Sequence, residues 1–332
     1  MMMRLIAALL FPVLSVFACD AGWTSVSGQC RIVLTATVVT AITLPTDWSS
    51  TNTIELVSQG GIGGAGSGGG SGGAGGGGGA GGNYGVWTNN TGLSGTYYYA
   101  AGAGSTIGVT SFCQDSLCTS AYQCQHGAEA SGTTGGTNSG TTCALGPGTP
   151  FLNGTLTNNN GGNGGNGGSG IAGGGGGGAG GPNGAGGNAS GSTGGTADNG
   201  TVASCSTGSE WGTGNGSGGG CNGAATSGNG TTGANYGGGG GGGRANGHTG
   251  GNGGNGLVII TYTPSGPVGY ADVSTGQDLP RGYYEKRVVS YFQGLFARWD
   301  QRTARQRVKE ALAKWKTQVL CVIVNDREMA MA

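Results

Sequence analysis

Charge, histidine and proline are scarce in this chain of 332 residues. Charged residues make up 8% of it, the formal net charge is zero, and eight prolines are present. So few prolines exclude the collagen triple helix, which needs a strict Gly-X-Y repeat rich in proline. The two histidines, His126 and His248, stand beside no obvious nucleophile, and the seven acidic residues before position 265 are scattered. We therefore predict no catalytic site, no cofactor and no enzymatic activity.

Glycine is what the chain has in excess. It accounts for 84 of 332 residues, about a quarter, against roughly 7% in ordinary proteins. Because glycine has no side chain to bury, such a chain cannot build a conventional core throughout. Either the glycine tracts are disordered tethers, or they belong to a fold in which backbones pack directly against one another. They are not phosphate loops, since no Gly-Lys-Ser/Thr follows them.

Three glycine tracts cover residues 60–82, 161–197 and 231–256. Parts of the second and third place glycine at least every third residue, as in Gly-Gly-Asn-Gly-Gly-Asn-Gly at 250–256. A three-residue period without abundant proline suits a left-handed extended helix with polyproline-II dihedrals, whose glycines let neighbouring helices approach and hydrogen-bond. Asn, Ser, Thr and Ala fill the other positions, as expected of outward-facing sites. We predict an ordered bundle; a flexible linker is the alternative.

The N-terminus has the pattern of an export signal. Met1 to Arg4 form a short basic start, Leu5 to Phe17 form an apolar stretch, and Ala18 ends a small-residue cleavage pattern. We predict a signal peptide at 1–18, with a buried hydrophobic helix as the alternative, and therefore an exported protein.

The nine cysteines agree with export, because an even set in an exported chain predicts disulfides. Cys321 stands alone in the C-terminal segment. The short-range pairs Cys19–Cys30 and Cys205–Cys221 are reasonable, although the sequence leaves the connectivity open. Cys113, Cys118 and Cys124, with His126, offer four potential zinc ligands. Their spacing is loose and contains no Cys-x2-Cys pair, so we predict no metal site. The candidate disulfide residues are Cys19, Cys30, Cys113, Cys118, Cys124, Cys143, Cys205 and Cys221.

Strand-forming residues frame the glycine region at both ends. Ile32–Leu44 and Thr53–Val57 are rich in Val, Ile and Thr, with a turn between them. Gly256–Pro264 is a second strand signal, ended by proline. We expect this last strand to pair with the N-terminal strands and so close the domain by joining its two ends.

Two less glycine-rich inserts, at 83–160 and 198–230, carry aromatic residues. Tyr and Trp give large contact area at low entropic cost, so these residues suit a binding surface. The alternative is that they form satellite cores pinned by disulfides. The candidate receptor-binding residues are Tyr84, Trp87, Tyr97, Tyr98, Tyr99, Phe112 and Trp211.

The composition changes after Pro264. Eleven Lys and Arg and seven acidic residues lie in 265–332, which gives 11 − 7 = +4. Apolar residues at helical spacing predict an amphipathic α-helical tail. We expect it to dock to a virion or fibre protein and not to nucleic acid, and the run 319–324 is too short to span a membrane. The docking candidates are Val288, Phe292, Leu295, Trp299, Leu312 and Trp315.

The frame from Thr40 to Pro264 resembles the glycine-rich domain of phage tail-fibre and related virion adhesins. Such domains open with a strand and turn resembling Ile42–Trp48 and a strand resembling Ile54–Val57, and close with a strand resembling Gly256–Tyr262. The resemblance implies that the tracts pack as a sandwich of polyglycine-II helices. It also implies that the loops joining them, here the two inserts, contact the host receptor.

Together these patterns predict a mainly β or irregular fold, with short strands framing a polyglycine-II bundle. The predicted domains are a signal peptide (1–18), an N-terminal β segment (19–58), the glycine-rich domain (59–264) and a basic helical tail (265–332). The predicted function is a phage-type adhesin that binds a protein or glycan receptor on a host cell, located on a virion surface or extracellularly. A structural component of a virion or bacterial surface layer, docked by its C-terminal helix, and an ice-binding protein are the alternatives.

Overall fold

The computed structural model describes residues 19–68, 73–106, 108–138, 143–146, 151–168, 172–224 and 228–265, and the strands β12 (Tyr270–Asp272) and β13 (Gln277–Leu279). Residues 19 to 265 belong to one compact unit, called the body below. The strands β12 and β13 pair antiparallel with each other in a second unit. The predicted signal peptide, the predicted tail helix and its six docking candidates lie outside the described residues.

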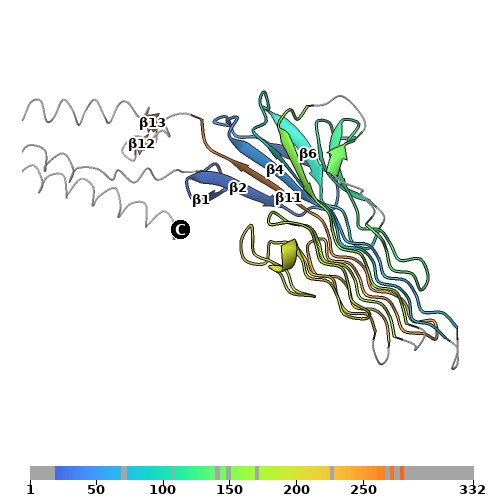
Figure 1. Ribbon diagram of the computed structural model, residues 1–332. Coiled ribbons are helices and arrows are strands. Elements are labelled where there is room, and N and C mark those ends of the chain that lie inside the picture. Colours follow the sequence, from blue (N-terminus) through green and yellow to red (C-terminus); the bar gives the residue numbers. More distant parts are fainter. Residues whose placement is uncertain are drawn as a thin grey trace, which may run out of the picture. The chain divides into compact units, whose positions relative to one another are not determined.

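A six-stranded antiparallel sheet, called sheet A, joins the two ends of the body (Figure 1). The predicted closing strand is β11, which lies between β2 and β4 and is buried along its whole length. The pairing of the closing strand with the N-terminal strands is therefore confirmed. In spatial order the sheet contains β1 (Thr24–Val26), β2 (Gln29–Leu34), β11 (Leu257–Tyr262), β4 (Asn52–Val57), β5 (Tyr84–Thr88) and β10 (Thr155–Asn159).

A second antiparallel sheet of five strands, sheet B, comes mostly from the first insert. It contains β3 (Thr40–Thr43), β6 (Thr96–Ala100), β7 (Val109–Cys113), β8 (Ala121–Gln125) and β9 (Cys143–Leu145). The predicted strand region Ile32–Leu44 is divided, because β2 belongs to sheet A and β3 to sheet B. The fold is mainly β, as predicted. Within the described ranges the helical structure is the 3-10 turn η1 (Asp198–Gly200), and no helix there is long and apolar enough to cross a membrane.

Alternate residues of sheet A enter two hydrophobic cores. Ile54, Leu56, Val258 and Ile260 join the core shared with sheet B. Their neighbours along the same strands, among them Leu257 and Ile259, join a second core with Trp211 and Ala179. This follows from the two-residue period of a strand, which sends successive side chains to opposite faces. Both faces of the central strands are therefore covered, which explains why β11 is apolar throughout.

The glycine tracts run side by side away from the sheets and are joined by backbone hydrogen bonds (Figure 1). The bonds recur every three residues between tracts that are far apart in sequence. Gly60, Gly63 and Gly66 donate to the carbonyls of Gly254, Gly251 and His248, at 2.9 Å each. Backbones thus pack directly against backbones, and a flexible tether does not describe these tracts.

The longest unbroken glycine runs lie inside this assembly. Residues 75–79, 173–178 and 237–243 are buried, and each run hydrogen-bonds to the other two. A Cβ added to Gly176 would lie 2.0 Å from the carbonyl oxygen of Gly239, well inside any real contact. Three mutually touching tracts leave no room for a side chain on any face, so their sequences are nearly pure glycine.

Tracts at the outside of the assembly carry one Asn per few glycines. Asn166, Asn188 and Asn222 are exposed, as predicted for the non-glycine positions. Their side chains also complete the hydrogen bonding, since their Oδ1 atoms accept from the N–H groups of Gly135, Asn163 and Gly194, at 2.9, 2.7 and 2.8 Å in that order. An asparagine at the edge thus takes the place of a missing neighbouring carbonyl.

Candidate functional site

Four disulfides close loops in the body. They include both pairs named from the sequence, Cys19–Cys30 and Cys205–Cys221. The three cysteines of the zinc alternative are instead oxidised, as Cys113–Cys118 and Cys124–Cys143. Disulfides form and persist in oxidising compartments, so this set indicates an extracellular or otherwise exported protein.

All but one of the aromatic residues expected to bind a receptor lie in the cores. Six of the seven have at most 7% of their surface exposed, and Tyr98 is half-buried. For the six buried residues the expectation of a contact surface is therefore wrong, because rings so deeply buried cannot touch a receptor; for Tyr98 it stays a prediction. Tyr84 and Trp211 are in the second core, and Trp87, Tyr97, Tyr99 and Phe112 are in the core between the sheets.

These rings pack against one another in the first core. Tyr97 stacks on Phe112 with ring centroids 5.3 Å apart, and Phe151 lies against both. Cys124 and Cys143, joined by a disulfide, belong to the same core. The arrangement fits the alternative of cores pinned by disulfides. The sequence held a signal for it, because Tyr97 and Tyr99 alternate with Tyr98 along one strand.

The described residues at the end of the glycine tracts away from the sheets are called the distal turns (Figure 1). Backbone hydrogen bonds connect the turns to segments that are distant in sequence: Asn246 donates to Gly68, Thr133 accepts from Gly167, and Ser192 accepts from Gly223. The distal turns are residues 67–68, 73–74, 131–134, 168, 172, 190–193, 224, 228 and 244–248.

Small hydroxyl and amide side chains are exposed on the distal turns. The described exposed residues are Ser67, Ser131, Thr134, Ser190, Thr193 and Asn246. Sequence reasoning missed them because each turn by itself looks like a linker. Two share the pattern Ser-Gly-Thr/Ser-Thr and are closed by the same bridge, Ser131 to Thr134 and Ser190 to Thr193. That repeated pattern is the feature of the sequence from which these two turns could have been predicted.

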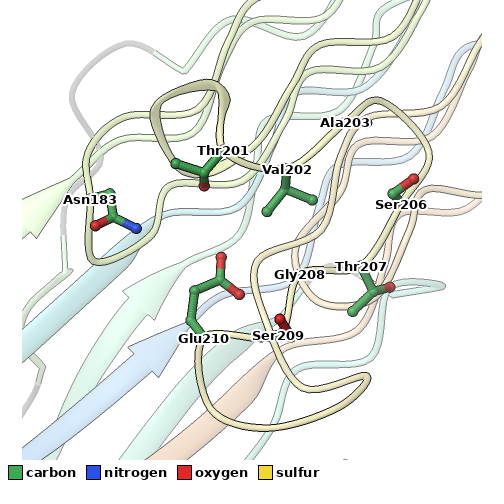
Figure 2. Close-up of a pocket in the computed structure, with 9 residues that line it drawn as sticks. All are labelled: Asn183, Thr201, Val202, Ala203, Ser206, Thr207, Gly208, Ser209 and Glu210. Carbon is green, nitrogen blue, oxygen red and sulfur yellow. The ribbon is translucent and has the colours of Figure 1, made fainter.

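A hollow of about 410 Å³ lies on the second insert, near sheet A (Figure 2). In Figure 2 the Glu210 carboxyl group points toward Thr201 and Val202. The Cys205–Cys221 disulfide closes the loop that supplies much of the lining. The lining residues are Asn183, Thr201, Val202, Ala203, Ser206, Thr207, Gly208, Ser209 and Glu210.

Two buried carboxyl groups, those of Asp198 and Glu55, bond residues of this insert. Asp198 is fully buried and accepts hydrogen bonds from the Asn183 backbone N–H (2.6 Å) and the Thr201 hydroxyl (2.9 Å). Glu55 of β4 is buried and accepts from the Tyr84 hydroxyl (2.7 Å) and from the indole N–H of Trp211 (3.0 Å). The Trp211 bond therefore ties the insert to the sheet through a carboxyl group.

Burial raises the pKa of the carboxyl groups of Glu55 and Glu210. For Glu55 the loss of solvation outweighs the hydrogen bonds from Tyr84 and Trp211 and the attraction of Arg31, so its pKa lies above the ordinary value of 4.5. For Glu210 burial is again the main cause, and the nearby Asp198 adds to it. Since a raised pKa means that folding favours the protonated form, these groups stabilise the fold most at low pH.

We predict that the body becomes less stable as the pH rises from about 4.5, and that Glu55→Gln reduces this loss. The stabilisation is complete below the unfolded pKa and is lost as pH rises through the higher folded pKa. Glutamine keeps an acceptor for Tyr84 and Trp211 but cannot ionise. Thermal unfolding at pH 4.5, 6 and 8 measures both effects, and equal pH dependence in the two proteins would contradict the assignment.

The distal turns and the hollow on the second insert have different chemistry. The distal turns present hydroxyl, amide and backbone groups that can donate to and accept from a polar ligand. The hollow adds the Glu210 carboxyl group to a similar set.

Compared with known proteins, the chain matches no family model and none of the curated proteins.

Proposed function

We propose that the protein is a non-catalytic adhesin of the kind carried by phage virions, and that the distal turns bind a receptor on the host cell. The observation that supports this most is the gathering of the distal turns, whose described residues are up to about 180 positions apart in the sequence, at one end of a hydrogen-bonded scaffold. Loops held by a rigid scaffold are common binding sites, because the scaffold has already met the entropic cost of positioning them.

We propose further that the glycine tracts are polyglycine-II helices. The three-residue spacing of the hydrogen bonds between tracts supports this, because an extended helix of that type has three residues per turn. So do the buried glycine runs at 173–178 and 237–243, which a helix hydrogen-bonded on several sides requires.

The two ends of the body fit the two ends of an adhesin. The chain leaves the body at Ser265, whose backbone N–H donates to Asp47 and whose hydroxyl donates to Trp48, beside sheet A. The distal turns lie at the other end of the tracts (Figure 1). We therefore propose that the tail at 265–332 docks to a virion or fibre protein while the distal turns face the host.

A bulky residue on the distal turns should block binding. We expect Thr134→Trp and Thr193→Trp, both at exposed positions, to weaken binding to a host cell by about tenfold or more, because contacts at the centre of an interface carry most of its energy. The measurement is the binding isotherm of purified, disulfide-intact protein on whole cells.

The matched control is Thr155→Trp, on the exposed edge strand β10 of sheet A. It should bind cells like the unmodified protein, and all three variants should keep the same unfolding temperature. Loss of binding in the Thr155 variant alone would move the receptor site from the distal turns to the sheets.

A further inference from the structure

The distal turns have an unusual charge. Among their residues the sequence has no Asp or Glu and one arginine, Arg244. The body as a whole is acidic, since residues 19–265 hold seven carboxyl side chains and two cations, Arg31 and Arg244. The nearest acidic residue in sequence is Glu129, two positions before the turn 131–134. A lone cation thus stands among neutral hydroxyl and amide groups at the proposed receptor end.

Arg244 and Arg31 differ in their partners. The Nε of Arg31 donates to the Thr261 hydroxyl at 3.3 Å, within sheet A. The Nε of Arg244 is buried and has no hydrogen-bond partner among the residues that the structure describes. A buried donor without a partner is costly, and one explanation for such a group is an ion that is bound in the functional state.

The turn that carries Arg244 is fixed to its neighbours. The Arg244 backbone N–H donates to Gly228 at 3.2 Å, Asn246 donates to Gly68 at 2.9 Å, and the carbonyl of His248 accepts from Gly66 at 2.9 Å. The guanidinium group is therefore attached to a backbone whose position is set by two other segments of the chain, at 66–68 and at 228. Such preorganisation favours binding, because little freedom remains to be lost.

From these observations we infer that the receptor is an anionic saccharide, and that Arg244 binds its carboxylate or phosphate group while the neighbouring hydroxyls and amides bind its sugar hydroxyls. This inference rests on the proposed function. Arginine suits the role because its planar guanidinium matches both anions. The absence of carboxylates from the turns also removes repulsion toward an anion.

The test measures binding of the full chain to three immobilised polysaccharides: polygalacturonate, a phosphate-bearing mannan and neutral dextran. We expect binding to one or both anionic polymers but not to dextran, weakened at high salt. Arg244→Gln should reduce it by about tenfold or more, the usual size of a lost charge-assisted hydrogen bond, and Arg244→Lys by less. Glu129→Gln is the control and should bind at least as well as the unmodified chain.

The outcomes separate the two proposals. Preference for polygalacturonate or for the mannan identifies a carboxylate or a phosphate as the recognised group. If the chain binds host cells but not the anionic polymers, and Arg244→Gln binds those cells equally well, the inference is overturned and the adhesin proposal stands. If the unmodified chain binds neither cells nor polymers, both fail. An equal unfolding temperature for Arg244→Gln and the unmodified chain shows that any loss is not caused by unfolding.

Discussion

Replacing Gly176 by alanine is expected to destabilise the body by about 3 kcal/mol or more, at the upper end of the cost of overpacking a core. The added Cβ would lie 2.0 Å from the carbonyl oxygen of Gly239. Neither side can yield cheaply, because Gly176 donates to Cys221 and Gly239 donates to Gly177 in the same region. Moving one tract would break bonds to several others.

The matched control is Asn252→Ala, at an exposed position of another tract. It should change stability by no more than about 0.5 kcal/mol, as surface substitutions usually do. Urea unfolding followed by circular dichroism measures both variants, with protease resistance as a second readout if the Gly176 variant does not fold. A Gly176→Ala protein as stable as Asn252→Ala would show that the tracts are not packed backbone to backbone.

Removing the Cys124–Cys143 disulfide is expected to have the next largest effect. It joins β8 to β9, and its two cysteines are at most 1% exposed in the core between the sheets. The bond closes a loop with a sequence separation of 19, for which the loss of loop-closure entropy in the unfolded chain is worth about 3 kcal/mol. The double variant Cys124→Ala/Cys143→Ala should therefore lose about that much stability in urea unfolding.

Cys113→Ala/Cys118→Ala provides the comparison, because its loop has a sequence separation of 5 and the same relation gives about 2 kcal/mol. The two double variants should rank in that order. A Cys124/Cys143 variant with the stability of the unmodified protein would contradict the view that this disulfide pins the sheet B core.

The sheets were more predictable than the site. The run Leu257–Tyr262 has strand-forming residues throughout. A strand that is apolar on both faces has to be covered on both faces, so its position in the middle of sheet A follows from its own sequence. The division of Ile32–Leu44 between two sheets did not follow, because the Thr-rich segment between β2 and β3 has the same strand propensity as its flanks. Propensity does not report a change of partner.

The candidate site depended on information that single segments lack. Tyr97 and Phe112 have the composition of a binding surface, yet their burial is decided by sheet B, whose pairing joins distant segments. Conversely, Ser131 and Thr193 look like linker residues. Their grouping at one end follows from which tract hydrogen-bonds to which, and a period of three residues does not specify those partners.

Binding of the purified, disulfide-intact chain to a panel of bacterial cells tests the central claim most directly. The adhesin proposal predicts selective, saturable binding to some members of the panel, lost in Thr134→Trp and Thr193→Trp and kept in Thr155→Trp. Absence of binding to every cell tested, by a protein that unfolds cooperatively and is therefore folded, would contradict it.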